Sequence, residues 1–274
     1  MKKHNIKLVL VIVFIFVIGF VSINGGLLDK DKITKNIINV SENSIEFDCP
    51  YENLNELAKN NKRVARILEN KEEYPEFLLE ALSKNTELID YVLDYNDNNG
   101  KVLSNDIGNV KKGDYPLLLQ YDKRWGYAYY GEYNLAISGC GPTTIVMVVA
   151  GLTGRNDVTP YTVAKYAMEN NYYSESGTKW ALMKEGIKHF GIKSRELNNS
   201  KKLIFKELEK GHPIICSMKP GIFTTTGHFI AIVGIKDNKF IVHDPNSKKK
   251  SKGLWSYEEI KDEIRNMWVF EKKI

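Results

Sequence analysis

Cysteine is scarce in this sequence, which has three cysteines among 274 residues. No two of them have the Cys-x-x-Cys spacing that is typical of zinc sites, and three are too few to build a small disulfide-stabilised scaffold. The spacing of other potential ligands indicates no metal site either. We therefore expect a protein that works without a metal or another cofactor.

A strong excess of one charge is also missing. The 39 Lys and Arg residues are nearly balanced by 34 Asp and Glu residues, which gives a formal net charge of +5. Such a charge attracts anionic surfaces only weakly, and we expect no nucleic-acid partner. Hydrophobic residues make up 43% of the chain and charged residues 27%, as in ordinary globular proteins. This composition excludes disordered, collagen-like and polytopic membrane proteins.

A long hydrophobic run occurs at the amino terminus. Residues 8–23 are apolar apart from Gly19 and Ser22, and three lysines precede them. A positively charged flank before an apolar run is typical of an export signal. The run is long for the core of a signal peptide and short for a membrane span, which needs about 20 residues. Because no small-residue cleavage site follows, we favour an uncleaved membrane anchor over a removed signal peptide, and an extracytoplasmic location for the rest.

Changes in residue pattern divide the chain into four predicted segments. They are a signal peptide or membrane anchor (1–27), a polar linker (28–52), a small helical region (53–110) and the main domain (111–274). The helical region is predicted because apolar side chains recur at helical spacing from Leu54 onward. It is too small to hold much core alone and should pack on the main domain. Whether it covers a cleft, acts as a spacer or docks a partner stays open.

The main domain combines helical and strand-like patterns. We predict helices at 143–152, 160–170, 180–190, 202–210 and 258–264, and strands at 213–218, 228–234, 239–243 and 267–270. The segment 235–238 is predicted to be a turn, so the strands on either side of it should form an antiparallel hairpin. Helices followed by antiparallel strands indicate an α+β fold.

Cys140 stands in the sequence Ser-Gly-Cys-Gly-Pro-Thr-Thr, directly before the first helix predicted in this domain. The positive end of a helix dipole favours a thiolate at such a position. We expect Gly139 and Gly141 to leave room for a substrate backbone next to the sulfur. Taken alone, Cys140 is as consistent with a small core residue as with a nucleophile.

His228 begins one strand of the predicted hairpin, and Asp244 follows the other strand. The start of one strand lies beside the end of its antiparallel neighbour, so these side chains should be within reach of each other. Asp244 would then accept a hydrogen bond from the imidazole and hold the ring toward a thiol. Taken alone, His228 is also consistent with a structural histidine, and Asp244 with a plain turn.

Gln120 precedes Cys140 in the chain and carries an amide that can donate to an oxyanion, together with the backbone N–H of the nucleophile. The order glutamine, cysteine, histidine, acid is that of papain-like cysteine peptidases. In that architecture the nucleophile opens a helix while the base and the acid share a sheet.

From about residue 115 to 270, the sequence resembles the stand-alone C39-like cysteine peptidases of bacteria. The matching stretches are LLQYDKRWGYAYYG, SGCGPTTIVMVVAGLTG, LEKGHPIICSMKPG, TTTGHFIAIVGI and VHDPNS. The resemblance implies a papain-like fold, in which a helical part that carries the nucleophile packs on an antiparallel sheet. It also implies that Cys140 is the nucleophile, His228 the base, Asp244 the group that orients the imidazole and Gln120 the oxyanion donor. A small α-helical region and the N-terminal apolar helix would precede this fold.

These observations predict an exported cysteine peptidase that hydrolyses peptide or amide bonds through a thioester acyl-enzyme. Its partners would be a peptide or protein substrate and, through the N-terminal helix, a membrane. Two alternatives stay open: a non-catalytic module that binds peptides or cell-wall stems, and an acyl-transferring transpeptidase or amidase. A disulfide between Cys49 and Cys216 also stays open, although Cys216 falls in an apolar strand that favours a core position.

Overall fold

The computed structural model describes residues 50–273. The predictions for the N-terminal apolar helix and for nearly all of the linker, Cys49 included, lie outside the described residues. Within residues 50–273, no helix is both long enough and apolar enough to cross a membrane. The residues from Pro50 onward form one compact unit.

Helices make up most of the chain from Pro50 to Asn98, whereas residues 99–110 of the predicted helical region (53–110) contain none. The helices are α3 (Pro50–Asn60), α4 (Lys62–Glu69), α5 (Glu76–Lys84), α6 (Ile89–Leu93) and α7 (Tyr95–Asn98), with 3-10 turns η1 (Lys71–Glu73) and η2 (Thr86–Leu88) between them. Their buried apolar side chains form a cluster that continues beyond these helices through Leu119, Tyr121, Tyr127 and Ala136. The Tyr91 and Tyr127 rings stack with centroids 4.6 Å apart. The helical region therefore shares its core with the rest of the protein.

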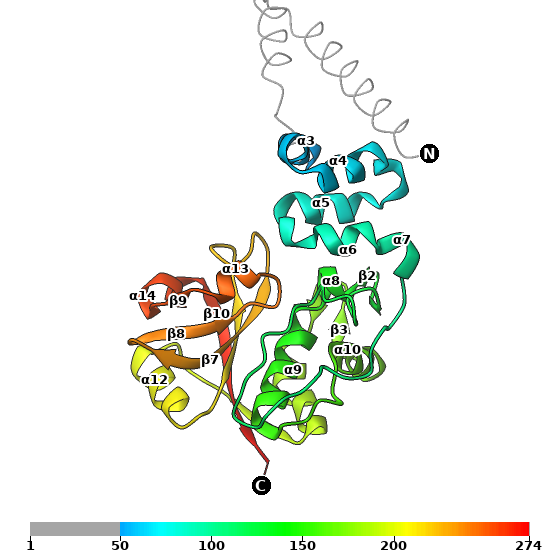
Figure 1. The fold of residues 1–274 in the computed structure, drawn as a ribbon. Helices are drawn as coiled ribbons and strands as arrows, with labels where there is room; N and C mark the ends of the chain where they lie inside the picture. Colours follow the sequence, from blue (N-terminus) through cyan, green and yellow to red (C-terminus); the bar gives the residue numbers. More distant parts are fainter. Residues whose placement is uncertain (1–49, 274) are drawn as a thin grey trace, which may run out of the picture. The chain divides into compact units, whose positions relative to one another are not determined.

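Six antiparallel strands form the central sheet, in the order β5-β10-β6-β7-β8-β9. Their bounds are Ile192–Glu196 for β5, Ile214–Met218 for β6, His228–Lys236 for β7, Lys239–His243 for β8, Leu254–Trp255 for β9 and Ile264–Lys272 for β10. Two small hairpins lie outside this sheet, β1 (Tyr129–Tyr130) with β2 (Tyr133–Asn134) and β3 (Tyr173–Ser174) with β4 (Gly177–Thr178). The predicted combination of helices and an antiparallel sheet is confirmed (Figure 1).

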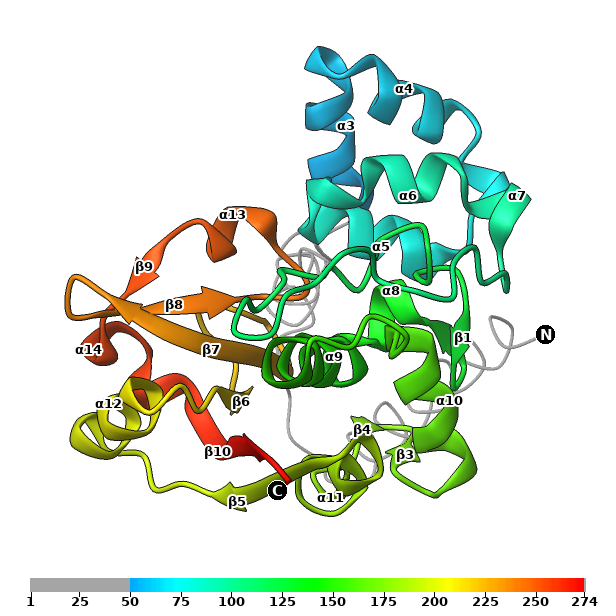
Figure 2. The same ribbon diagram turned by 60° about the horizontal axis from the view of Figure 1, so that its bottom comes forward.

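Helices cover both faces of the sheet (Figure 2). On one side, α9 (Cys140–Thr153) packs on β7 and α10 (Pro160–Glu169) packs on α9, whereas α12 (Lys201–Glu209) contacts β7 from the other side. Side chains of β7 alternate accordingly: Phe229 and Ala231 join the α9 core, and Ile230 and Ile232 join the α12 core. Because both faces are buried, β6 and the first half of β7 consist almost entirely of apolar residues.

Helix α9 starts at Cys140, three residues before the predicted start, and ends at Thr153. Pro142 is compatible with this longer helix because it stands in the first turn, where the backbone N–H groups have no intrahelical partner. Gly154 ends the helix with φ 77°, and its N–H donates to the Ala150 carbonyl. The observed start places Cys140 in the first turn of a long buried helix.

The turn between β7 and β8 is tighter than predicted. It consists of Asp237 and Asn238, both with positive φ, so that Lys236 and Lys239 already pair across the hairpin. Positive φ at both central residues gives the type I′ geometry that suits the twist of a hairpin. A bulge between Ile232 and Gly234 shifts the strand register.

Two predicted helices are shorter and irregular in the structure. The segment 180–190 divides into α11 (Ala181–Lys184) and η3 (Gly186–Phe190), which ends at Gly191 with φ 79°. The segment 258–264 contains α14 (Tyr257–Ile260) and η4 (Lys261–Glu263), and Ile264 already belongs to β10. The remaining short helices are α8 (Leu135–Ser138) and α13 (Lys248–Ser251).

Candidate active site

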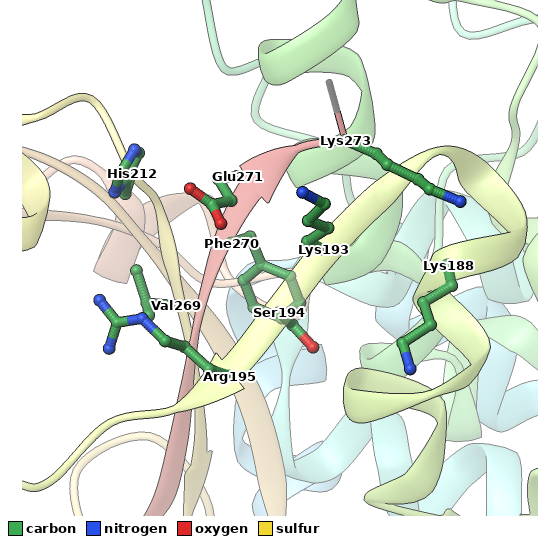
Figure 3. Close-up of a pocket in the computed structure, with 9 residues that line it drawn as sticks. All are labelled: Lys188, Lys193, Ser194, Arg195, His212, Val269, Phe270, Glu271 and Lys273. Atoms are coloured by element: carbon green, nitrogen blue, oxygen red, sulfur yellow. The ribbon is translucent and has the colours of Figure 1, made fainter.

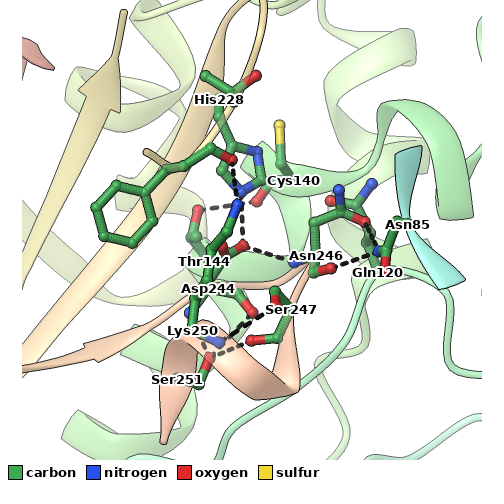
Figure 4. A network of polar contacts seen from close by, with 12 residues as sticks. Asn85, Gln120, Cys140, Thr144, His228, Asp244, Asn246, Ser247, Lys250 and Ser251 are labelled. Carbon is green, nitrogen blue, oxygen red and sulfur yellow. Dashed lines mark hydrogen bonds and ion pairs between the residues drawn. The ribbon is translucent and has the colours of Figure 1, made fainter. Parts of the chain in front are cut away.

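His228 and Asp244 meet at the edge where β7 begins and β8 ends. The imidazole Nε2 lies 2.7 Å from Asp244 Oδ1, and His228 is 7% exposed and Asp244 0%. The backbone N–H of Asn246 donates to the same carboxylate oxygen at 2.8 Å. The Asp244 carboxylate is thus fixed from two sides and holds one imidazole nitrogen, leaving Nδ1 as the nitrogen that can face a thiol (Figure 4).

Cys140 lies beside the His228 ring at the start of α9 (Figure 4). Its side chain is partly exposed, whereas Cys216 is completely buried in β6. Burial lowers the pKa of His228, but the hydrogen bond with Asp244 and the interaction with Cys140 outweigh it and raise the pKa to about 9. The imidazole therefore stays protonated at neutral pH, next to the sulfur.

The glycines on either side of Cys140 serve the packing of the protein itself. A Cβ on Gly139 would lie 2.4 Å from the Leu135 carbonyl oxygen, and a Cβ on Gly141 would lie 2.5 Å from Thr178 Oγ1. The prediction that both glycines make room for a substrate backbone is therefore wrong, because protein atoms occupy that space. They allow the turn from α8 into α9 to pack closely.

Gln120 is buried, with 3% of its surface exposed. Its side-chain nitrogen donates to the carbonyls of Ala136 at 2.8 Å and Ile137 at 3.3 Å. Its backbone N–H donates to the Pro245 carbonyl at 2.8 Å, which links it to the loop that follows Asp244. The structure thus brings Gln120 to the wall of the same cleft as Cys140, with its amide engaged by two backbone carbonyls. Its role as an oxyanion donor stays a prediction.

The loop that follows Asp244 is held by residues that the sequence analysis did not identify. The Glu87 carboxylate accepts hydrogen bonds from Ser247 Oγ at 2.9 Å and from the backbone N–H groups of Lys248 and Lys249 at 2.9 and 3.2 Å. Asn85 Nδ2 donates to the Asn246 carbonyl at 2.7 Å. Glu87 and Asn85 both belong to the helical region. The sequence around Asp244 gives no indication that residues so far away in the chain contact this loop.

An open cleft with a volume of about 1160 Å³ contains Cys140, His228 and Gln120. The loop 221–227 and the segment 246–250 border it, together with residues of α3, α5 and η2. Apolar side chains of its lining include Leu57, Phe77, Ala81, Tyr133 and Ile137. The helical region is therefore part of the cleft wall.

A second hollow, of about 430 Å³, lies beside β5 and the end of β10 (Figure 3). Basic side chains prevail in it, but Arg195 and His212 are paired with Glu207 at 2.9 and 3.0 Å, and Lys188 is paired with Glu185. Its lining contains no cysteine. It lacks the chemistry of the cleft around Cys140.

Cys216, in β6, and His243, the last residue of β8, are not part of the hydrogen-bonded pair of His228 and Asp244. Burial lowers the pKa of His243 to about 4 and raises that of the Cys216 thiol to about 12. Both groups are therefore uncharged at neutral pH. Within residues 50–273, no group of three or more His, Cys, Asp or Glu side chains is arranged to hold a metal ion.

Comparison with known proteins identifies the family. The sequence model that defines the Peptidase_C39 like family matches residues 94–273 of this chain. Among solved structures, the peptidase domain of Streptococcus ComA, a bifunctional ABC transporter involved in a quorum-sensing pathway, is 21% identical, with a TM-score of 0.41 over 59% of this chain and 100% of that chain. A Bacillus anthracis protein described as a C39-like peptidase is 14% identical, with a TM-score of 0.42 over 60% of this chain and 98% of that chain.

No curated protein matches the chain. The family match spans most of the described residues and confirms the resemblance found in the sequence. The chain therefore belongs to the Peptidase_C39 like family, and this membership indicates a cysteine peptidase type of function.

Proposed function

We propose that this protein hydrolyses peptide bonds with Cys140 as nucleophile, His228 as acid and base, and Asp244 as the group that orients the imidazole. The observation that carries the proposal is the Nε2–Oδ1 contact of 2.7 Å between His228 and Asp244, on a ring that lies beside the Cys140 sulfur. Pure binding of a peptide requires none of these three groups.

In the first half of the reaction, the Cys140 sulfur, whose proton His228 has taken, attacks the carbonyl carbon of the scissile bond. The carbonyl becomes an oxyanion, and we expect the backbone N–H of Cys140 and the side chain of Gln120 to stabilise it. His228 transfers a proton to the leaving amine, the C–N bond breaks, and a thioester links the acyl group to Cys140.

In the second half, water replaces the amine. His228, now neutral, takes a proton from the water as it attacks the thioester carbonyl. The C–S bond breaks, the carboxylic acid leaves, and the sulfur and the imidazolium are restored. Asp244 holds the ring in one orientation through both proton transfers.

The proposal is tested by incubating the full-length chain with an unbiased peptide library and identifying the products by mass spectrometry. We expect cleavage by the wild type, none by Cys140→Ala, and retained cleavage by the matched control Cys216→Ala. Iodoacetamide should label Cys140 before Cys49 or Cys216. Preferential labelling of either other cysteine, or cleavage by Cys140→Ala, would contradict the proposal.

The same experiment separates the two alternatives. A non-catalytic binding module would retain peptides equally well in the wild type and in Cys140→Ala, without products. An acyl-transferring enzyme would give amide products when an amine such as glycinamide is added, in place of the free acid. Product ratios with and without the amine distinguish these outcomes.

We also propose that the protein is exported and held at a membrane by its N-terminal apolar run. The support is the sequence pattern of residues 8–23 behind three lysines. The expected result is recovery in the membrane fraction, with digestion of the chain by a protease added outside intact cells. Recovery in the soluble cytoplasmic fraction would exclude this location.

A further inference from the structure

The cleft around Cys140 carries an excess of positive charge. Five lysines line it, Lys84, Lys248, Lys249, Lys250 and Lys252, against two carboxylates, Glu80 and Glu87. Four of the five lysines belong to one short segment, residues 248–252, which we name the lysine rim. Lys248, Lys249 and Lys252 are exposed, and Lys250 is half-buried.

Both carboxylates of the cleft are already engaged. Glu80 forms an ion pair with Lys84 at 2.6 Å. Glu87 accepts hydrogen bonds from Tyr121, from Ser247 and from two backbone N–H groups. Among the ion pairs of residues 50–273, none includes a lysine of the rim. The four rim charges thus face the cleft without a carboxylate partner from the described chain.

The lysine rim is held in a fixed place relative to the proposed catalytic groups. It follows Asp244 by a few residues, and Ser251 Oγ accepts from the Asp244 backbone N–H at 2.9 Å. Lys250 Nζ donates to the Phe223 carbonyl at 3.1 Å, which ties the rim to the loop 221–227 (Figure 4). A peptide that occupies the cleft therefore passes close to these charges.

We propose that the substrates of this cleft are peptides with acidic side chains in the segment next to the scissile bond. The proposal rests on the proposed peptidase function. Aspartate and glutamate side chains would pair with the rim in a partly desolvated cleft, where ion pairs gain more than at an open surface. Lysine or arginine at the same positions would be repelled by like charge, so the rim also excludes basic peptides.

The test starts from one peptide that the wild type cleaves in the library experiment or, if none is cleaved, from one that Cys140→Ala binds. Its residues on both sides of the cut are changed one at a time to Asp or to Lys, and kcat/KM is measured at low and high salt. Three proteins are compared: the wild type, Lys248→Gln/Lys249→Gln, and the control Lys202→Gln/Lys206→Gln. The control lysines are exposed on α12 and do not line the cleft. Replacing them removes the same number of positive charges as the rim variant does.

In the wild type, we expect at least one position at which Asp is preferred over Lys by about tenfold at low salt, with a smaller preference at high salt. The rim variant should reduce this preference severalfold, and the control should leave it unchanged. An unchanged preference in the rim variant, or equal rates for Asp and Lys peptides at every position, would overturn the proposal.

Binding of the same peptides to Cys140→Ala, followed by fluorescence anisotropy, gives a readout that does not need turnover. If the wild type cleaves no peptide but Cys140→Ala binds the Asp peptides more tightly than the Lys peptides, the peptidase function fails while the charge preference holds. If the wild type cleaves peptides without a charge preference, only the proposal about the lysine rim fails. Lys252→Gln, also exposed on the rim, replaces the double variant if the latter does not fold.

Discussion

The Glu87 carboxylate lies 2.9 Å from Ser247 Oγ, although 160 positions separate the two residues in the chain. This contact joins the helical region to the loop that begins at Asp244. The family match begins only at residue 94, so the residue that fixes this loop comes from outside the matched segment. The support of the proposed catalytic groups therefore extends beyond the part of the chain that defines the family.

Replacing Glu87 by Ala should lower both stability and activity. The change leaves the Ser247 hydroxyl and two backbone N–H groups without their acceptor, at a cost of about 1–3 kcal/mol in the free energy of unfolding. Because the loop then moves more freely, kcat should fall by about tenfold, an order-of-magnitude expectation from misplacing an orienting group. Urea unfolding and initial rates check this. Glu80→Ala, which removes an exposed ion pair on the same cleft wall, should change both values much less.

Replacing Asp244 by Asn should change the pH profile of the reaction. The hydrogen bond to Asp244 is one of the interactions that raise the pKa of His228, and removing the carboxylate charge should lower that pKa. The alkaline limb of kcat/KM should therefore shift to lower pH, and kcat should fall by roughly 10²-fold or more. Asp157→Asn, at an exposed ion pair, serves as the control. An unchanged alkaline limb would contradict the orienting role of Asp244.

The raised pKa of His228 predicts the direction of a change in stability with pH. Its value is about 9 in the folded protein against 6.5 ordinarily, so the folded state binds a proton more tightly than the unfolded state. The stabilisation is complete below about pH 6.5 and is lost as pH rises through 9. The loss is on the order of 3 kcal/mol.

This pH effect is measured as the difference in the free energy of unfolding between the wild type and His228→Gln from pH 6 to pH 10. The difference should shrink as pH rises. A difference that stays constant, or that grows toward alkaline pH, would show that His228 is not held protonated in the folded protein.

Replacing Gly141 by Ala should disturb the start of α9. The added Cβ would lie 2.5 Å from Thr178 Oγ1, which requires a shift of the helix or of β4 and costs about 1–3 kcal/mol. Gly227→Ala provides a matched comparison next to His228, because a Cβ there would meet no atom within 4 Å. Thermal unfolding should show a lower Tm for Gly141→Ala only. Equal Tm values would mean that the packing around Cys140 is looser than described.

Replacing Phe77 by Ala should weaken the binding of peptides with apolar side chains. Phe77 lines the cleft and packs edge-to-face on Tyr133, with ring centroids 5.1 Å apart. Since Phe77 lines the cleft but is not one of the proposed reacting groups, KM should rise severalfold while kcat stays nearly constant. Leu103→Ala, at a residue 51% exposed that does not line the cleft, is the comparison. A fall in kcat without a change in KM would point to misfolding or to a different role.

Local sequence patterns were sufficient for the elements that carry the site. Strands β6 and β7 and helix α9 can be recognised in the sequence as apolar runs. They are apolar because each is buried on both faces. The hairpin between His228 and Asp244 could be predicted from one turn between two strands. Strand β5 could not, because only Ile192 of its five residues is buried, so it lacks the alternation that a half-buried strand shows.

The support around the site could not be predicted in this way. Glu87 and Asn85 act on the loop after Asp244 through contacts between residues about 160 positions apart. No periodicity or spacing reports such a pairing. The role of the two glycines beside Cys140 was also misjudged, since the atoms that fill their space come from Leu135 and from Thr178. These features depend on tertiary packing alone.

The hydrophobic core of the helical region continues into Leu119, Tyr121 and Tyr127. The rest of the chain should therefore not fold as a separate fragment without these helices. A fragment that begins at residue 94, where the family match begins, would leave these side chains without the helices that cover them. It would expose a large apolar surface and aggregate. In calorimetry, the helices and the sheet should melt together in one cooperative transition, so that loss of the first helices should unfold the protein as a whole.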